Sequence, residues 1–133
     1  MDCKNLSVGF VTAVVASLLV GPMTVASSVC AAEPTSFAED VLPIFKGRCV
    51  GCHQPGGAGY EKSGLDLTTY EGLMKGTKFG PMVIARDPDS SNLIWLLDWR
   101  ASRELRMPHG SKKLSTCDRA AIRGWILEGA KNN

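Results

Sequence analysis

Several common signatures are missing from this 133-residue chain, and their absence narrows its possible functions. No βαβ pattern, internal repeat or second domain is visible, and the length fits at most one ordinary domain. The net charge is only +2 and no basic run carries interleaved aromatics, which argues against a nucleic-acid partner. No acid–base pair, nucleophile constellation or phosphate loop stands out. The sequence therefore predicts no enzyme and no small-molecule substrate, and leaves an acidic protein partner open.

The first 32 residues differ in composition from the rest of the chain. A weakly positive start at Lys4 precedes an apolar run over residues 6–20, and small residues lead up to Ala32. This is the three-part layout of a secretory signal peptide, so we expect cleavage near Ala32 and an exported, periplasmic domain over residues 33–133. An uncleaved membrane anchor is the alternative, since residues 6–26 have about the length that a span needs.

The mature region predicts an all-α fold of three to four short helices joined by long loops. Apolar residues recur at helical spacing near both ends of this region. We expect loops over residues 54–67, 77–89 and 101–113, and no strand, because the short apolar run at residues 82–85 has no partner. Loops this long in so small a chain indicate that a large buried cofactor organises them. The expected helices cover residues 35–49, 68–76, 90–99 and 114–133.

Local signals set the expected ends of these helices. Ser36 can cap the first one, with Glu39 closing a capping box, and Pro43 predicts a kink or step. Ser115 can cap the last helix with Asp118 in the same role. Thr68 or Thr69 would cap the second helix, with Gly76 as its stop, and Ser90 or Ser91 would start the third.

Aromatic and small residues suggest how the helices pack. The first and last helices are expected to cross, with Phe45, Ile122 and Trp125 in contact and with Ala121 and Gly124 allowing a close approach. Two further indoles, those of Trp95 and Trp99, are expected in the core and in the walls of a cofactor pocket.

The cysteine count points away from simple disulfide pairing. Cys3 and Cys30 would leave with the leader, so an odd number, Cys49, Cys52 and Cys117, remains. An exported domain normally pairs its thiols. If the first two serve another purpose, Cys117 is a free thiol.

The stretch CVGCH, residues 49–53, allows three chemistries. A thioredoxin-like pair needs a strand before it, but here a helix precedes it and a glycine loop follows. A structural zinc site needs four ligands and only Cys117 and His109 remain as further candidates, while a three-ligand catalytic zinc would leave the fold unexplained. Covalent haem attachment fits best: the two thiols would form thioethers, and His53 would be an axial iron ligand.

A second axial ligand must come from the far side of the haem. Met107 is favoured, because it lies in a loop beside the stiff Pro108, and a methionine there raises the reduction potential. His109 is the competing ligand, and an open sixth position is the third possibility. Of the other mature methionines, Met74 fits a core position and Met82 stays possible.

Four blocks of this sequence resemble the small c-type cytochrome domain often called planctomycete-type. They are FAEDVLPIFKGRCVGCH, SGLDLTTYEGLMKG, GPMVIARDPDSSNLIWLL and RMPHGSKKLSTCDRAAIRGWILEGA, which occur in order between residues 37 and 130. The resemblance implies an all-α, class I cytochrome c-like fold around one covalent haem c. It further implies tethering by Cys49 and Cys52, with His53 and Met107 as the axial ligands.

The chain departs from that family at three positions. Arg86 stands where a glycine is usual, His109 where a second proline is usual, and Cys117 where a polar residue or proline is usual. Arg86 would either pair with a haem propionate or with the neighbouring Asp87 or Asp89, and an indole N–H could also reach a propionate.

Together these patterns predict single-electron transfer between transient redox protein partners. Two other functions stay open: a haem-binding subunit of a larger dehydrogenase or oxidase, and a ligand-binding haem sensor with an open sixth position. The glycines of QPGGAG, residues 54–59, are interpreted as a turn that leads the chain away from His53 and passes close to the haem.

Overall fold

The first helix begins at a serine cap and changes its hydrogen-bond pattern before its proline. A computed structural model describes residues 33–133, and here the Ser36 side chain accepts a hydrogen bond from the Glu39 N–H at 3.2 Å. Asp40, not the predicted Glu39, closes the capping box by accepting from the Ser36 N–H at 2.9 Å. A π-helical turn, η1 (Phe37–Val41), then leads into α1 (Leu42–Arg48), whose first turn holds Pro43. This change confirms the predicted step in the first helix. Its physical cause is that Pro43 has no N–H to continue the helical hydrogen bonds.

The remaining described elements are short helices, and residues 33–133 contain no strand. Thr69 caps α3 through the Gly72 N–H at 3.0 Å, and Ser115 caps α5 through the Asp118 N–H at 3.0 Å, as predicted. Ser91 precedes α4 but does not cap it: its buried hydroxyl instead binds the backbone of Ile84 and Asp87. The elements after α1 are α2 (Ala58–Ser63), α3 (Tyr70–Lys75), α4 (Asn92–Leu97), a 3-10 turn η2 (Arg103–Leu105) and α5 (Thr116–Leu127).

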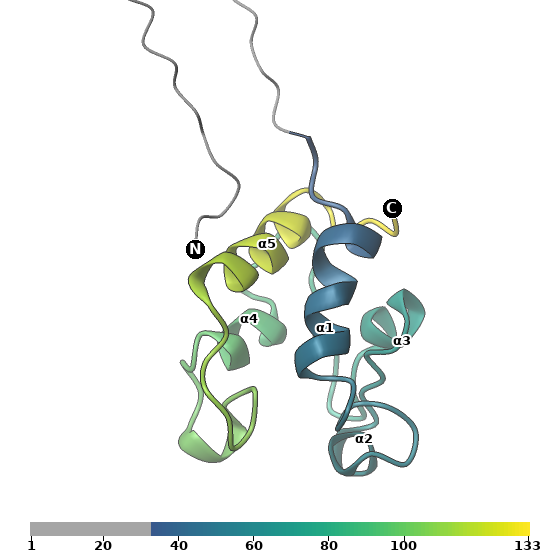
Figure 1. Cartoon of the computed structure of the whole chain (residues 1–133), viewed down its shortest axis with the longest axis vertical. Helices are drawn as coiled ribbons and strands as arrows, with labels where there is room; N and C mark the ends of the chain where they lie inside the picture. Colours follow the sequence, from purple (N-terminus) through teal and green to yellow (C-terminus); the bar gives the residue numbers. More distant parts are fainter. Residues whose placement is uncertain (1–32) are drawn as a thin grey trace, which may run out of the picture. The chain divides into compact units, whose positions relative to one another are not determined.

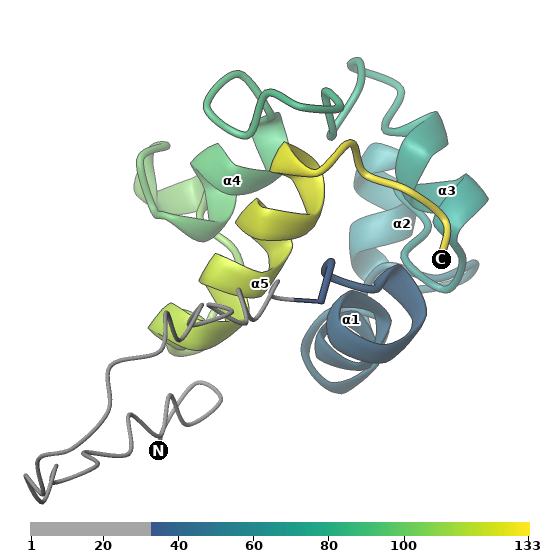
Figure 2. The same ribbon diagram turned by 90° about the horizontal axis from the view of Figure 1, so that it is seen from above.

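The start of the first helix packs against the last helix. The elements η1 and α5 are in contact, and the Phe37 and Trp125 rings lie 5.3 Å apart between centroids. Phe45, Ile122 and Trp125 are each almost completely buried. At Gly124 an added Cβ would come within 3.3 Å of the Thr35 hydroxyl, which confirms the predicted close approach at that residue. Figures 1 and 2 show α4 and α5 on one side of α1, and α2 and α3 on the other.

Two local predictions are wrong. Residues 54–67 were expected to form a loop throughout, but they contain α2, which begins after Gly57 and ends at Gly64, a left-handed residue with a φ of 75°. Trp95 was expected in the core, but 44% of it is exposed. Its indole N–H donates to the Asp89 carbonyl at 3.0 Å, and the Arg100 guanidinium covers its ring at 4.6 Å.

The predicted leader, residues 1–32, lies outside the described residues, so its cleavage stays a prediction. Within residues 33–133, none of the helices has the length and apolar character that crossing a membrane requires.

Arg86 adopts a backbone conformation that favours glycine. Its φ is 67°, and its N–H donates to the Ile126 carbonyl at 2.7 Å, which ties the segment before α4 to α5. The predicted pairing with Asp87 or Asp89 is wrong: Arg86 makes no ion pair with the described residues, and Asp89 binds Arg123 at 2.9 Å. The positive φ gives a physical reason for a glycine at this position.

Replacing Arg86 with glycine is expected to stabilise the protein by about 0.5–1 kcal/mol, because relief of the left-handed strain exceeds the entropic cost of glycine. Urea unfolding of the haem-loaded protein measures this difference. Arg86→Ala is the matched control, since it removes the charge and keeps Cβ. A glycine variant no more stable than the alanine variant would show that the backbone at this residue is not strained.

Candidate haem-attachment site

Cys49, Cys52 and His53 lie on one tight turn at the end of α1. The Cys49 N–H continues the helix to the Phe45 carbonyl at 2.8 Å. The Cys49 carbonyl then accepts from the N–H groups of Cys52 and His53, at 3.1 and 3.0 Å. The backbone therefore holds these three predicted site residues together as one rigid unit.

Both thiols of this turn are free, and they differ in exposure. Cys49 is half-buried and packs against the core, whereas Cys52 is exposed. Burial raises the pKa of Cys49 to about 11, although the Arg48 charge opposes this shift. Thiols that exchange disulfides carry a lowered pKa. The two cysteines thus have the spacing of a redox pair, but the raised pKa of Cys49 is the opposite of what disulfide exchange requires.

His53 lies at the end of the turn, where burial favours the neutral form of its imidazole. Burial lowers the pKa of His53 below its usual range, and the nearby Leu65 carbonyl partly offsets this effect. The ring Nδ1 of His53 is buried and has no hydrogen-bond partner among the described residues. A neutral imidazole is the form that binds a metal ion.

The glycines after His53 allow the next helix to pack directly on the turn. A Cβ added at Gly59 would lie 2.8 Å from His53 Cε1, and one added at Gly57 would lie 2.5 Å from the Cys52 carbonyl oxygen. The same Cys52 carbonyl accepts from the Tyr60 N–H at 2.9 Å. The sequence predicted only a turn here. The structure shows in addition that Gly57 and Gly59 let the start of α2 pack directly against Cys52 and His53.

Met107 lies in the segment between α4 and α5. Its side chain is half-buried and packs against the core, while its backbone N–H donates to the Leu96 carbonyl at 3.2 Å. The competing ligand His109 is exposed, beside Gly110 with a φ of 65°. Met82 is buried among core residues. Of Met107 and the competing His109, Met107 is thus the one that the surrounding residues hold more firmly.

One hydrogen bond joins the two halves of the candidate site. Arg48, directly before Cys49, donates from Nη2 to the Lys112 carbonyl at 3.2 Å. Lys112 follows Met107 by five residues. The structure therefore gathers Cys49, Cys52 and His53 on one turn, and it ties the loop that carries Met107 to the helix end beside them.

Residues 49–109 match the sequence profile of the family described as planctomycete cytochrome C. The match supports a planctomycete-type cytochrome c domain over this part of the chain. The matched segment begins at Cys49 and ends at His109, so it holds every candidate attachment and axial residue. The match suggests a haem-binding electron carrier. Searches of curated proteins and of solved structures found no match.

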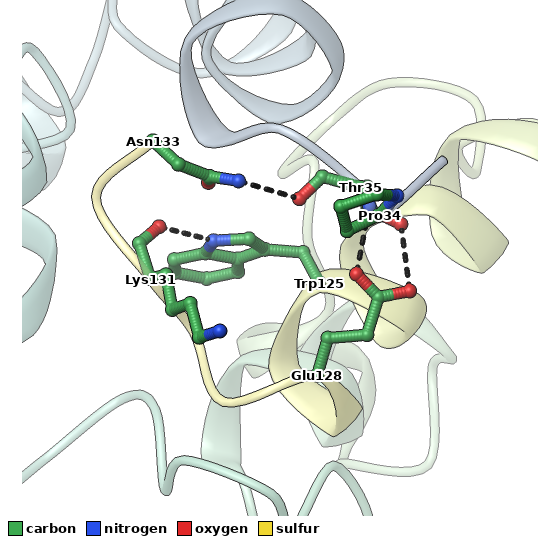
Figure 3. Close-up of a pocket in the computed structure, with 6 residues that line it drawn as sticks. All are labelled: Pro34, Thr35, Trp125, Glu128, Lys131 and Asn133. Atoms are coloured by element: carbon green, nitrogen blue, oxygen red, sulfur yellow. Dashed lines mark hydrogen bonds between the residues drawn. The ribbon is translucent and has the colours of Figure 1, made fainter. Parts of the chain in front are cut away.

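The residues of the cytochrome domain fit a haem. Two reduced thiols at C-x-x-C spacing can each form a thioether, and burial favours the neutral form of the imidazole that follows them. Within residues 33–133, no group of three or more His, Cys, Asp or Glu side chains is placed to hold a metal ion. A small pocket of about 60 Å³ lies at the C-terminal end of α5 (Figure 3). None of the candidate site residues lines it; its lining residues are Pro34, Thr35, Trp125, Glu128, Lys131 and Asn133.

Two other sequence predictions need correction here. Cys117 is disulfide-bonded, so it is not the predicted free thiol. The Trp99 indole N–H donates to the Met107 carbonyl at 2.9 Å, and the Trp95 indole N–H is used by Asp89. Neither indole is therefore free for a propionate. Sequence reasoning missed this role of Trp99, because nothing in the local pattern links residues 99 and 107. The pairing of Arg86 with a propionate stays a prediction.

Proposed function

We propose that this protein is an exported c-type cytochrome that carries single electrons on one haem, held by Cys49 and Cys52 and ligated by His53 and Met107. The observation that carries the proposal is the turn at residues 49–53, where two free thiols and a neutral imidazole lie together at the start of a cytochrome c family segment. A single haem follows from the single C-x-x-C-His motif in the sequence.

The protein residues would keep the site unchanged in both oxidation states. A haem supplies a reversible one-electron change at its iron, whose potential rises with a methionine ligand. His53 is held by its own backbone turn, and the backbone of Met107 is held at the end of α4. Ligands fixed in this way move little when the charge of the iron changes. The packing of η1 on α5 supports a class I-like arrangement, in which the first and last helices meet.

The leader pattern supports export, because covalent haem attachment takes place outside the cytoplasm. We propose that residues 33–133 act in the periplasm after cleavage near Ala32. Retention of residues 1–32 would instead anchor the same domain to a membrane.

Basic side chains gather in the loop that carries Met107, and they favour an acidic redox partner. Residues 100–113 contain one acidic side chain, Glu104, and five basic ones: Arg100, Arg103, Arg106, Lys112 and Lys113. A local excess of positive charge speeds encounter with negatively charged partners and does so most at low salt. The partner would dock transiently over this loop, close to Met107.

Small redox reagents of opposite charge test both electron transfer and the docking face. We expect the reduced protein to be oxidised by anionic hexacyanoferrate(III) at a rate that falls with added salt, and by cationic tris(phenanthroline)cobalt(III) at a rate that rises. Arg103→Glu is expected to slow the anionic reaction by about threefold or more at low salt, because it reverses one charge in the loop that carries Met107. Stopped-flow absorbance measures these rates.

Lys131→Glu is the matched control, since it makes the same change of net charge near the end of the chain. Equal effects of the two charge reversals would argue against docking over the Met107 loop. A reduced haem protein that neither reagent oxidises would rule out the electron carrier itself.

A further inference from the structure

Trp99 and Leu96 together hold the peptide group of Met107. The Trp99 indole N–H donates to the Met107 carbonyl at 2.9 Å, and the Met107 N–H donates to the Leu96 carbonyl at 3.2 Å. Both polar groups of the Met107 backbone are thus bound by residues at the end of α4. Seven residues separate Trp99 from Met107, so the contact closes the intervening loop.

Trp99 is itself held in place. Its φ is 61°, a conformation that persists in a non-glycine residue only where the surroundings enforce it. The Arg106 guanidinium and the Lys113 ammonium lie 5.7 and 5.8 Å from the centre of its ring. The Lys113 ammonium also donates to the Asp98 carbonyl at 2.7 Å. These contacts keep the half-buried indole aimed at Met107.

The other tryptophan of this region makes different contacts. Trp95 donates to the Asp89 carbonyl, before α4, and its exposed ring lies against Arg100. It has the same donor group and a similar cation contact, but it does not bind the Met107 loop. Trp95 is therefore a natural control for Trp99.

We propose that Trp99 is a positioning residue that keeps the Met107 thioether available to the iron, an inference that rests on the proposed function. A thioether is a weak, uncharged donor, so its occupancy depends strongly on how firmly the protein holds it. Loss of the indole N–H leaves the Met107 carbonyl without its donor and lets the loop move away. An added ligand then competes more easily for the same coordination position.

Binding of imidazole to the ferric, haem-loaded protein measures this competition. Trp99→Phe keeps an aromatic ring and removes the N–H donor together with one ring of the indole. It is expected to tighten imidazole binding about fivefold, the factor that one ordinary hydrogen bond contributes. Trp95→Phe is expected to leave the affinity unchanged. In a Met107→Ala background, imidazole binds tightly and Trp99→Phe adds nothing, because no thioether remains to be positioned.

The outcomes separate the two proposals. If Met107→Ala removes the methionine-to-iron charge-transfer band and Trp99→Phe leaves imidazole affinity unchanged, the role of Trp99 is overturned and the proposed ligand stands. If Met107→Ala leaves that band intact, the ligand assignment fails and the role of Trp99 fails with it.

A measurement on the unmodified protein covers the case in which Trp99→Phe does not fold. Hydrogen exchange of the indole N–H groups, followed by NMR, is expected to quicken at Trp99 when imidazole displaces Met107, and to stay constant at Trp95. Equal behaviour of the two indoles would overturn the proposal.

Discussion

Replacing both Cys49 and Cys52 with alanine is expected to remove all covalently bound haem. Each thiol supplies one thioether, and the two lie on a single backbone turn. The domain is small, and its core is modest without a cofactor. Loss of the haem should therefore lower the free energy of unfolding by at least about 3–5 kcal/mol, the cost of removing one large buried aromatic side chain. Haem staining after denaturing electrophoresis and thermal unfolding measure the two effects.

The single replacements are the matched controls. Cys49→Ala and Cys52→Ala each keep one thiol, so each is expected to retain haem through one thioether and to lose less stability than the double variant. Cys49 packs on the core and Cys52 is exposed, so the loss of stability should be larger for Cys49→Ala. A double variant that still carries haem after denaturation would place the attachment elsewhere.

Met107→Ala is expected to remove the methionine-to-iron charge-transfer band and to lower the reduction potential. The change should be on the order of 0.1 V or more, a fraction of the roughly 0.8 V range that axial ligands span. The opened position should bind carbon monoxide rapidly in the reduced protein, whereas the unmodified protein should bind it slowly. Absorption spectra and a potentiometric titration measure these changes.

His109→Ala is the control for this ligand assignment. His109 is exposed, so its replacement is expected to leave the band and the potential unchanged. A band that survives in Met107→Ala would contradict the assignment. Rapid carbon monoxide binding by the unmodified protein would favour the ligand-binding sensor instead.

Local features of the fold were predictable from the sequence, because helix caps depend on neighbouring residues. Ser36, Thr69 and Ser115 each accept the hydrogen bond expected of a cap. The step near Pro43 was equally local, since it follows from a missing N–H. The helix α2 was missed because glycine and polar residues hide its short pattern.

The sequence motif of the candidate site could be predicted, but the contacts that join this motif to distant parts of the chain could not. The spacing of Cys49, Cys52 and His53 predicted the attachment motif, and the structure places the three residues on one turn. The contacts of Trp99 with Met107, and of Arg48 with Lys112, join residues far apart in the chain and leave no periodic signal. Gly59 illustrates the same limit: its contact with the His53 ring depends on how α2 folds back.

The intact mass of the purified, denatured protein tests the central claim most directly. The proposal predicts a polypeptide mass increased by that of one haem, with a tryptic peptide containing Cys49, Cys52 and His53 carrying the addition. A mass equal to that of the polypeptide alone, from cells that attach haem to other c-type cytochromes, would contradict it.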